Sequence, residues 1–237
     1  MNNENLTTKI GVVGAGGRIG DELLKLIKQN PNLEPSLGIG NKSIGFLKNM
    51  NDFNKVNSKD IDILIDFSSP AFFLEALDFC TANKIKLVSG TTGLTKEHHA
   101  KMQFAGATIP ILWAPNMSLG IAVLKKSLNV FKSIPHFDFQ IEEWHHRNKK
   151  DSPSGTALYL QSELEKVIEK KCPPTMVMRS GGIFGVHKIY ATSDEEMISF
   201  EHMALNRTVF ARGALVGASW LIKHSKKGVY SLEDVIS

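Results

Sequence analysis

The sequence predicts an α/β protein with a doubly wound parallel sheet, joined to a smaller α+β domain with a mixed or antiparallel sheet. Short apolar runs alternate with helical patterns through the first half of the 237-residue chain. A glycine-rich segment follows the first of these runs directly. After residue 118 the alternation stops, and strand-like segments follow one another without intervening helices.

Composition places the chain among soluble globular proteins, with 42% hydrophobic and 22% charged residues. The net charge of +4 is mild and no basic run carries aromatic residues, which disfavours nucleic acid but suits an acidic small molecule. Cys80 and Cys172 lie far apart without CxxC spacing, so we expect reduced thiols and no metal site. No apolar run approaches membrane-spanning length, and we expect a cytoplasmic protein without membrane partners.

The first predicted strand, Thr8–Val13, leads into a turn with glycines at 14, 17 and 20 and then into a helical pattern. Strand, glycine turn and helix form the context in which a dinucleotide pyrophosphate binds to the N-terminus of a helix. The first glycine permits the tight turn, the second lets the pyrophosphate approach, and the third lets helix and strand pack closely. We therefore expect nucleotide binding here.

The second strand, about 33–39, ends in Gly40-Asn41-Lys42 and carries no carboxylate for the ribose. Because no acid repels a 2′-phosphate, and because Arg18 and Lys42 are cationic, the sequence favours NADPH, with NADH possible. A solvated loop lysine is the alternative interpretation of Lys42.

Residues 42–60 are polar and predict one weak element plus loop. Further parallel strands are expected at 61–67, 85–89 and 109–113, with helices over about 71–83 and 96–104. Ligands of doubly wound sheets bind beyond the carboxyl ends of the strands. Four segments should therefore line one crevice: 14–20, 66–69, 90–93 and 114–117.

The second half begins with a predicted helix over 118–131. Strands are then expected at 137–143, 176–179, 187–192 and 196–201. Near Arg207 the chain turns, and the short segment 209–211 precedes a helix expected at 214–222. This predicts domain boundaries near 118 and 207.

The most chemically loaded stretch is 142–170. A polar loop, His145–Asp151, precedes a helix that starts within Ser152–Thr156. Its buried face is expected to carry Leu158, Leu160, Leu164, Val167 and Ile168. The free N–H groups of its first turn can hold a carboxylate or phosphate, with Lys149 and Lys150 nearby. A capped surface helix after a solvated loop is the alternative interpretation.

These motifs together resemble the 4-hydroxy-tetrahydrodipicolinate reductase (dihydrodipicolinate reductase) family. The specific part is His145-His146, Lys149, Asp151 and Pro153-Ser154-Gly155-Thr156-Ala157. The resemblance extends over nearly the whole chain, through Asp66-Phe67-Ser68, Gly90-Thr91-Thr92-Gly93, Phe210-Ala211-Arg212-Gly213-Ala214 and the segment 228–236.

The resemblance implies an NAD(P)H-dependent oxidoreductase of the diaminopimelate route to lysine. This enzyme would reduce 4-hydroxy-tetrahydrodipicolinate to tetrahydrodipicolinate. It further implies a homotetramer, with a Rossmann cofactor domain at 1–118 and 208–237 and a substrate-binding and oligomerisation domain at 119–207.

The resemblance also implies site residues. It makes His145 the proton donor or acceptor and Lys149 the proton donor, with His146, Gly155 and Thr156 binding a small dicarboxylate. Cofactor contacts carry over to Gly14, Ala15, Gly16, Gly17, Arg18, Ile19, Gly90, Thr91, Thr92, Ala114, Pro115, Asn116 and Met117. His187 and His202 are the remaining histidines that could reach the site.

Trp144, Ser152 and Met117 differ from residues usual in the family, and we expect altered packing near the nicotinamide. Two alternative functions stay open. An aspartate dehydrogenase-like Rossmann oxidoreductase, acting on an amino-acid-derived acid, has no particular use for Lys149 together with the helix start. A non-catalytic nucleotide-binding sensor has no use for a proton donor beside an anion site.

Overall fold

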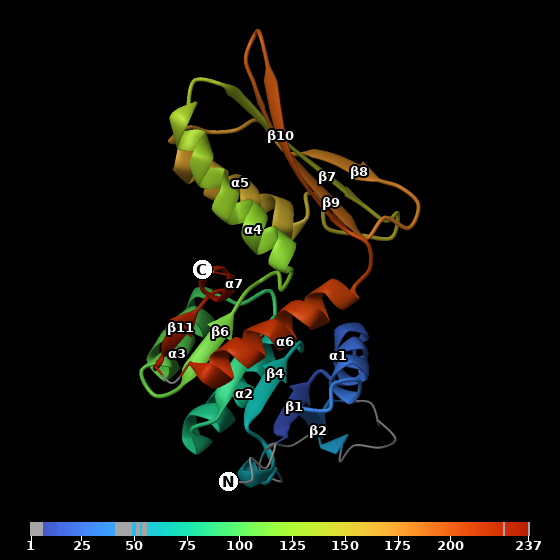
Figure 1. Cartoon of the computed structure of the whole chain (residues 1–237), viewed down its shortest axis with the longest axis vertical. Coiled ribbons are helices and arrows are strands. Elements are labelled where there is room, and N and C mark those ends of the chain that lie inside the picture. The colour runs from blue at the N-terminus through green and yellow to red at the C-terminus, as the bar shows by residue number, and fades with distance from the viewer. Residues whose placement is uncertain (1–6, 41–48, 51–52, 54–55, 225, 237) are drawn as a thin grey trace. The chain divides into compact units, whose positions relative to one another are not determined.

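The computed structural model describes residues 7–40, 49–50, 53, 56–224 and 226–236 (Figure 1). The chain divides into two compact units, one comprising the chain up to Met117 with Phe210–Val235 and the other comprising Ser118–Val209. No helix in these ranges is long and apolar enough to cross a membrane.

The first unit is built on a parallel sheet. Its strands lie in the order β11-β6-β5-β4-β1-β2-β3, and every neighbouring pair runs parallel. Their bounds are β1 (Thr8–Val13), β2 (Leu33–Ile39), β3 (Asn49–Met50), β4 (Ile63–Asp66), β5 (Lys86–Ser89), β6 (Pro110–Trp113) and β11 (Gly228–Tyr230). The central strands are buried, which explains why they read as unbroken apolar runs. The predicted doubly wound sheet is confirmed.

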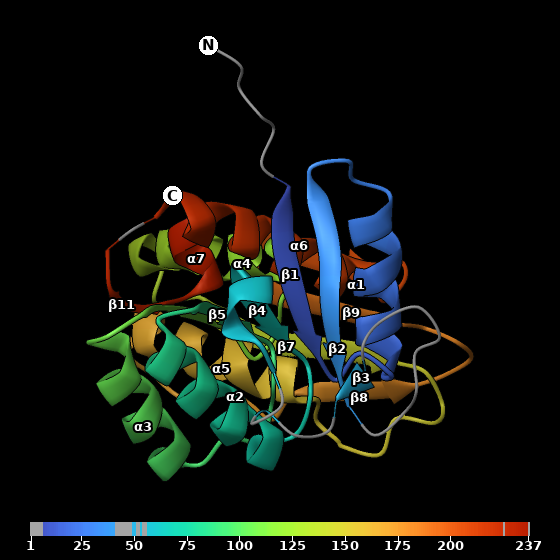
Figure 2. The same cartoon turned by 90° about the horizontal axis from the view of Figure 1, so that it is seen from below.

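Helices cover both faces of this sheet. They are α1 (Arg18–Lys28), α2 (Pro70–Asn83), α3 (Lys96–Gly106), α6 (Thr208–Lys223) and the short α7 (Leu232–Val235). The helices α2 and α3 lie side by side (Figure 2), and Phe73, Leu77 and Met102 join the strands in one core. The helix α6 packs closely because it is rich in small residues: a Cβ added at Gly217 would lie 3.1 Å from Leu112 Cδ1.

The second unit has a mixed sheet in the order β10-β9-β7-β8. Its strands are β7 (Asp138–His145), β8 (Met176–Arg179), β9 (Gly185–Thr192) and β10 (Met197–Ala204), and only the β7–β8 pair is parallel. One face is covered by α4 (Leu119–Ser127), the 3-10 helix η3 (Leu128–Ser133) and α5 (Gly155–Ile168) (Figure 1). The core between them includes Phe131, Ile141, Leu164 and Ile189.

The predicted start of the last long helix at residue 214 was wrong. The segment 209–211 belongs to α6, which runs without interruption from Thr208. Gly213, just before the predicted start, is buried within the helix beside Ala214, where small side chains permit close packing. The strand β11, for which we had no prediction, then completes the edge of the first sheet beside β6.

The predicted helix over 118–131 is shorter and continues as η3. The predicted buried face of α5 was also partly wrong. Leu158 is 51% exposed, whereas the buried stripe consists of Ala157, Leu160, Leu164 and Ile168. These four residues follow the three- and four-residue spacing of one helix face, and Leu158 falls one residue outside it.

Candidate active site

In the first unit, four parallel strands end at the same level. Val13 pairs with Asp66, Asp66 with Ser89, and Ser89 with Trp113. The loops that follow these residues therefore start side by side along one edge of the sheet. This register brings together the segments that the sequence assigned to a single crevice.

The glycine turn after β1 depends on having no side chains. Gly14 has φ +76°, and a Cβ added there would lie 2.2 Å from the carbonyl oxygen of Phe67. A Cβ at Gly20 would lie 2.3 Å from the carbonyl oxygen of Gly14, so helix and turn touch backbone to backbone. No side chain caps α1 at Gly17. First-turn N–H groups at Arg18 and Ile19 can therefore serve an anion.

A buried carboxylate joins two of these loops. Asp66 accepts hydrogen bonds from the hydroxyls of Ser89 and Thr91, both at 2.7 Å, and from Ser68. The backbone N–H of Ser68 donates to Thr91 Oγ1 at 3.0 Å. Burial raises the pKa of Asp66, against the effect of these hydrogen bonds. Sequence reasoning assigned no role to Asp66 beyond its place in the motif Asp66-Phe67-Ser68.

The predicted cofactor residues differ in their exposure and in how far their polar groups already have partners within the protein. The side chain of Thr91 is held by Asp66 and Ser68, its N–H donates to Ser89 Oγ, and its carbonyl accepts from Trp113 Nε1. Thr92, Gly17 and Arg18 are exposed. Several others are buried or partly buried: Gly14, Ala15, Gly16, Ile19, Gly90, Ala114, Pro115, Asn116 and Met117.

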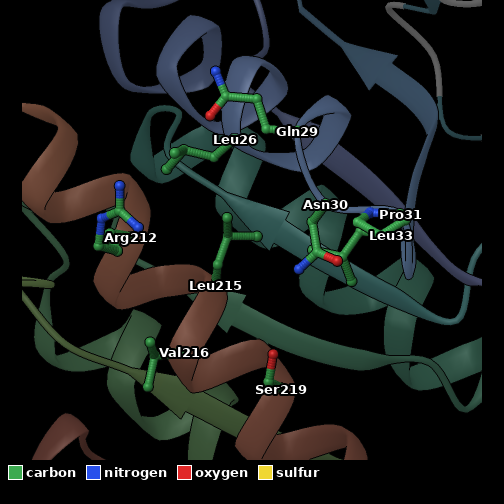
Figure 3. Close-up of a pocket in the computed structure, with 9 residues that line it drawn as sticks. All are labelled: Leu26, Gln29, Asn30, Pro31, Leu33, Arg212, Leu215, Val216 and Ser219. Carbon is green, nitrogen blue, oxygen red and sulfur yellow. The ribbon is translucent and has the colours of Figure 1, made fainter.

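A hollow of about 500 Å³ lies elsewhere in this unit, between α1 and α6 (Figure 3). Leu26 and Leu215 point into it from the two helices. Its lining includes Gln29 and Asn30, which follow the C-terminal end of α1. The glycine turn precedes the other end of this eleven-residue helix, about 16 Å away. The hollow is therefore distinct from the loops that follow the strand ends.

In the second unit, β7 carries two polar groups on its buried face. Side chains alternate along the strand, and Glu143 and His145 take positions that continue the apolar face of Phe139 and Ile141. Trp144 lies on the other face, where its Nε1 donates to Glu142 at 2.7 Å. Within this unit Trp144 thus points away from His145.

Glu143 is fully buried and satisfied by several donors. Its carboxylate accepts from Arg179 at 2.7 and 3.1 Å, from the backbone N–H of Ser154 at 3.0 Å, and from His145 Nδ1. Burial disfavours its charge, but the hydrogen bonds from Arg179, His145 and Ser154 outweigh burial and lower the pKa of Glu143. Sequence reasoning missed both Glu143 and Arg179 as site residues.

The surroundings of His145 favour its neutral form. Burial lowers its pKa, and the charges of Lys149 and Arg179 act in the same direction, against the hydrogen bond with Glu143. The ring of His187 stands edge-on to His145, with centroids 5.3 Å apart. His202 on β10 is the cross-strand partner of His187, and its ring contacts Ser118 Oγ at 3.1 Å.

The predicted loop and helix start are brought together. Ser154 caps α5 by accepting the N–H of Ala157 at 3.2 Å, which leaves Gly155 and Thr156 in the first turn. Lys149 lies 2.9 Å from the carboxylate of Asp151. Burial tends to raise the pKa of Asp151, but Lys149 and the backbone N–H of Gly155 lower it. His146 is partly buried, and its carbonyl accepts from the N–H of Lys149 at 3.0 Å.

The parallel sheet, with a glycine turn opening its first helix, has the architecture typical of dinucleotide-binding proteins. The mixed-sheet unit adds ionisable side chains, a combination common among dinucleotide-dependent oxidoreductases. Family models described as dihydrodipicolinate reductase match the chain throughout, the N-terminal model over residues 8–117 and the C-terminal model over 117–236. The chain belongs to the dihydrodipicolinate reductase family. The predicted resemblance is confirmed, and with it the NAD(P)H-dependent oxidoreductase class.

Named relatives agree with this assignment. A 4-hydroxy-tetrahydrodipicolinate reductase from Bdellovibrio bacteriovorus is 45% identical over 232 residues, which cover 96% of each chain. One from Wolinella succinogenes is 37% identical, covering 96% of this chain and 98% of the relative.

Solved structures share the fold. A dipicolinate-bound dihydrodipicolinate reductase from Paenisporosarcina sp. TG-14 superposes with a TM-score of 0.83 at 21% identity, covering 96% of this chain and 99% of that one. An aspartate dehydrogenase from Thermotoga maritima, the type of enzyme named above as an alternative, has a TM-score of 0.54 at 14% identity. The match covers 90% of this chain and 95% of that one.

The buried His187 should make stability depend on pH. Burial lowers its pKa to about 3, from an ordinary value of 6.5. Between these values the unfolded chain binds a proton that the folded chain does not, so stability falls as the pH is lowered through this window. The slope from one such group is at most about 1.4 kcal/mol per pH unit. We expect His187→Gln to flatten the pH dependence of the urea-unfolding free energy between pH 7 and 4. His136→Gln, at an exposed site, is the control, and equal slopes in both variants would contradict the prediction.

Proposed function

We propose that this chain reduces 4-hydroxy-tetrahydrodipicolinate to tetrahydrodipicolinate with NAD(P)H, in the diaminopimelate route to lysine. The observation that carries the proposal is the cluster on the second unit, where His145, Lys149 and the first turn of α5 lie within one loop and helix start. Family membership supports the same reaction.

The overall reaction replaces a hydroxyl group by hydrogen. Elimination of the hydroxyl together with a ring proton releases water and leaves a conjugated ring, to which a bound cofactor would supply a hydride. The negative charge then left on the ring is neutralised by one proton from a nearby acid. The Lys149 ammonium is our proposed donor of this one proton. His145 contacts Glu143 through Nδ1, so Nε2 is the ring nitrogen left to accept a proton or a hydrogen bond.

The substrate carboxylates are assigned to His146, Gly155 and Thr156. The N–H groups of a first helical turn favour anions, and Gly155 and Thr156 occupy that turn in α5. The carboxylate of Asp151, beside both Lys149 and the N–H of Gly155, illustrates that this corner accommodates a carboxylate. The Paenisporosarcina relative was solved with dipicolinate bound, which supports a small dicarboxylate.

The proton-transfer roles can be tested with substrate generated from pyruvate and aspartate semialdehyde by the preceding synthase, while NADPH oxidation is followed. We expect Lys149→Ala and His145→Ala to lower kcat by about 10²–10⁴-fold. Lys150→Ala, an exposed neighbour, should stay near the wild-type rate. Absence of wild-type turnover above background would contradict the proposed function, and a fully active Lys149→Ala would contradict the assigned donor.

For the cofactor we propose NADPH, with NADH possible, held by the glycine turn and the loops after β5 and β6. No carboxylate follows β2, and Arg18 is exposed at the start of α1. Lys42, the other cation considered, lies outside the described residues. The named cofactor residues stay a proposal, in which Thr91 serves through its backbone position because its side chain is held by Asp66.

Charge at the 2′-phosphate should set the preference. Lys42→Glu and Arg18→Glu should each raise the KM for NADPH about tenfold while sparing NADH, since charge-assisted hydrogen bonds are worth roughly 1.5–3 kcal/mol. Lys28→Glu, at the far end of α1, is the control. Unchanged constants for both cofactors in Lys42→Glu would exclude a role for that residue.

We also propose a homotetramer assembled through the second unit. Exposed apolar side chains lie on both edge strands of its sheet, β8 and β10, as expected of surfaces that other copies cover. They are Met176, Val177, Met197, Ile198 and Met203, each at least 38% exposed.

Assembly can be measured by light scattering. The double variant Met197→Lys/Ile198→Lys should lower the molar mass in solution, because a charge cannot be buried unpaired in an interface. Phe104→Lys, which replaces an 81% exposed apolar residue of the first unit, should leave the mass unchanged. A monomeric wild type would contradict the tetramer.

A further inference from the structure

Glu143 is an ionised carboxylate on the core-facing side of β7. It has no exposed surface and follows Phe139 and Ile141 on the inner face of β7. Burying a charge is costly unless it is paired and hydrogen-bonded, so the buried carboxylate of Glu143 depends on the groups that donate hydrogen bonds to it. The donors here come from three separate elements: β8 through Arg179, the start of α5 through Ser154, and β7 itself through His145.

The carboxylate determines which nitrogen of His145 carries the proton. An ionised carboxylate can only accept hydrogen bonds, and it contacts Nδ1. In the neutral ring Nδ1 therefore carries the hydrogen and Nε2 keeps a lone pair. A Cβ added at Gly185 would lie 3.1 Å from Nε2, so glycine at that position leaves room around this nitrogen.

The partner of Glu143 also holds the loop. Arg179 donates to the carbonyl of Asp151 at 2.7 Å while its other contacts go to Glu143 and the carbonyl of Met178. The loop is further tied by the N–H of Arg147, which donates to the carbonyl of Gly181 at 3.2 Å. The Glu143–Arg179 pair thus spans strand, loop and helix start.

We propose that Glu143, held by Arg179, is a positioning residue that fixes His145 as the Nδ1–H tautomer and sets the loop carrying Lys149 against the first turn of α5. The catalytic role given to His145 rests on the proposed function. The tautomer and the loop geometry do not depend on it, so experiments can test the positioning role of Glu143 separately from the proposed function.

The tautomer can be read from the ¹⁵N chemical shifts of the histidine rings in folded protein labelled with ¹⁵N-histidine. The His145 signals are assigned as those that disappear in His145→Gln. We expect wild-type His145 to be the Nδ1–H form. In Glu143→Gln an amide replaces the carboxylate, so one of its donors must face Arg179, Ser154 or His145, and the single tautomer should be lost. A wild-type Nε2–H form would overturn the proposal, whether or not turnover is observed.

Kinetics give a second readout. Glu143→Gln should lower kcat by about 10²-fold or more and leave the KM for NADPH unchanged, since the cofactor residues lie on other elements. The acid limb of the kcat profile should move to lower pH, because the carboxylate that favours protonated His145 is gone. Unaltered kcat and pH profile would overturn the proposal.

Glu142→Gln is the matched control. It removes a carboxylate from the adjacent residue of β7, but Glu142 points to the other face, where Tyr190 Oη donates to it at 2.7 Å and Trp144 Nε1 also donates. We expect the wild-type tautomer and a kcat within about twofold of wild type, well below the effect of removing an acid–base group.

A double variant separates positioning from simple charge balance. Glu143→Gln alone leaves the Arg179 guanidinium without its carboxylate, whereas Glu143→Gln/Arg179→Met removes both charges. We expect the double variant to recover thermal stability but neither the tautomer nor kcat. Recovery of kcat would show that Glu143 serves only as counter-ion to Arg179, and would overturn the proposal.

Discussion

A carboxylate that is buried must have all of its hydrogen bonds satisfied, and this requirement organises the candidate site of each unit. In the first unit Asp66 accepts hydrogen bonds from hydroxyls at the ends of neighbouring strands, including those of Ser89 and Thr91. In the second unit Glu143 accepts hydrogen bonds from Arg179, from His145 and from the backbone at the start of α5. Each carboxylate sits at or near the end of a strand and holds the backbone of the loops beyond it.

The two carboxylates differ in how they are satisfied. Neutral hydroxyls surround Asp66, and burial raises its pKa. Glu143 has a guanidinium beside it, and its pKa is lowered despite complete burial. The first arrangement satisfies a carboxylate without a cation partner, and the second places a negative charge beside Nδ1 of His145. Similar side chains in similar positions thus provide different electrostatics.

Local pattern predicted most of the fold and part of the site. The strands β1, β2, β4, β5 and β6, the glycine turn and the helix start at Gly155 depend on near neighbours in sequence, and they were found close to where they were expected. The parallel strand β11 was not predicted. The contact between Glu143 and Arg179 joins residues 36 positions apart, and no local signal connects them. The hydrogen bond from Thr91 to Asp66 was also missed, because it joins residues 25 positions apart. Alternation along β7 placed Glu143 on the core face, which was the one available indication that its charge needed a partner.

The path of the chain has a consequence for its synthesis. The first unit is interrupted: its last strand, β11, pairs with the edge of β6 but comes after the whole second unit in sequence. While the chain is being made on the ribosome, the β6 edge of that sheet stays without its neighbour until residues 228–230 have emerged. Domains generally fold as they emerge, and unpaired edges favour aggregation. Completion of this parallel sheet therefore has to wait until the whole second unit has been synthesised, and a chain truncated before β11 would retain an open edge.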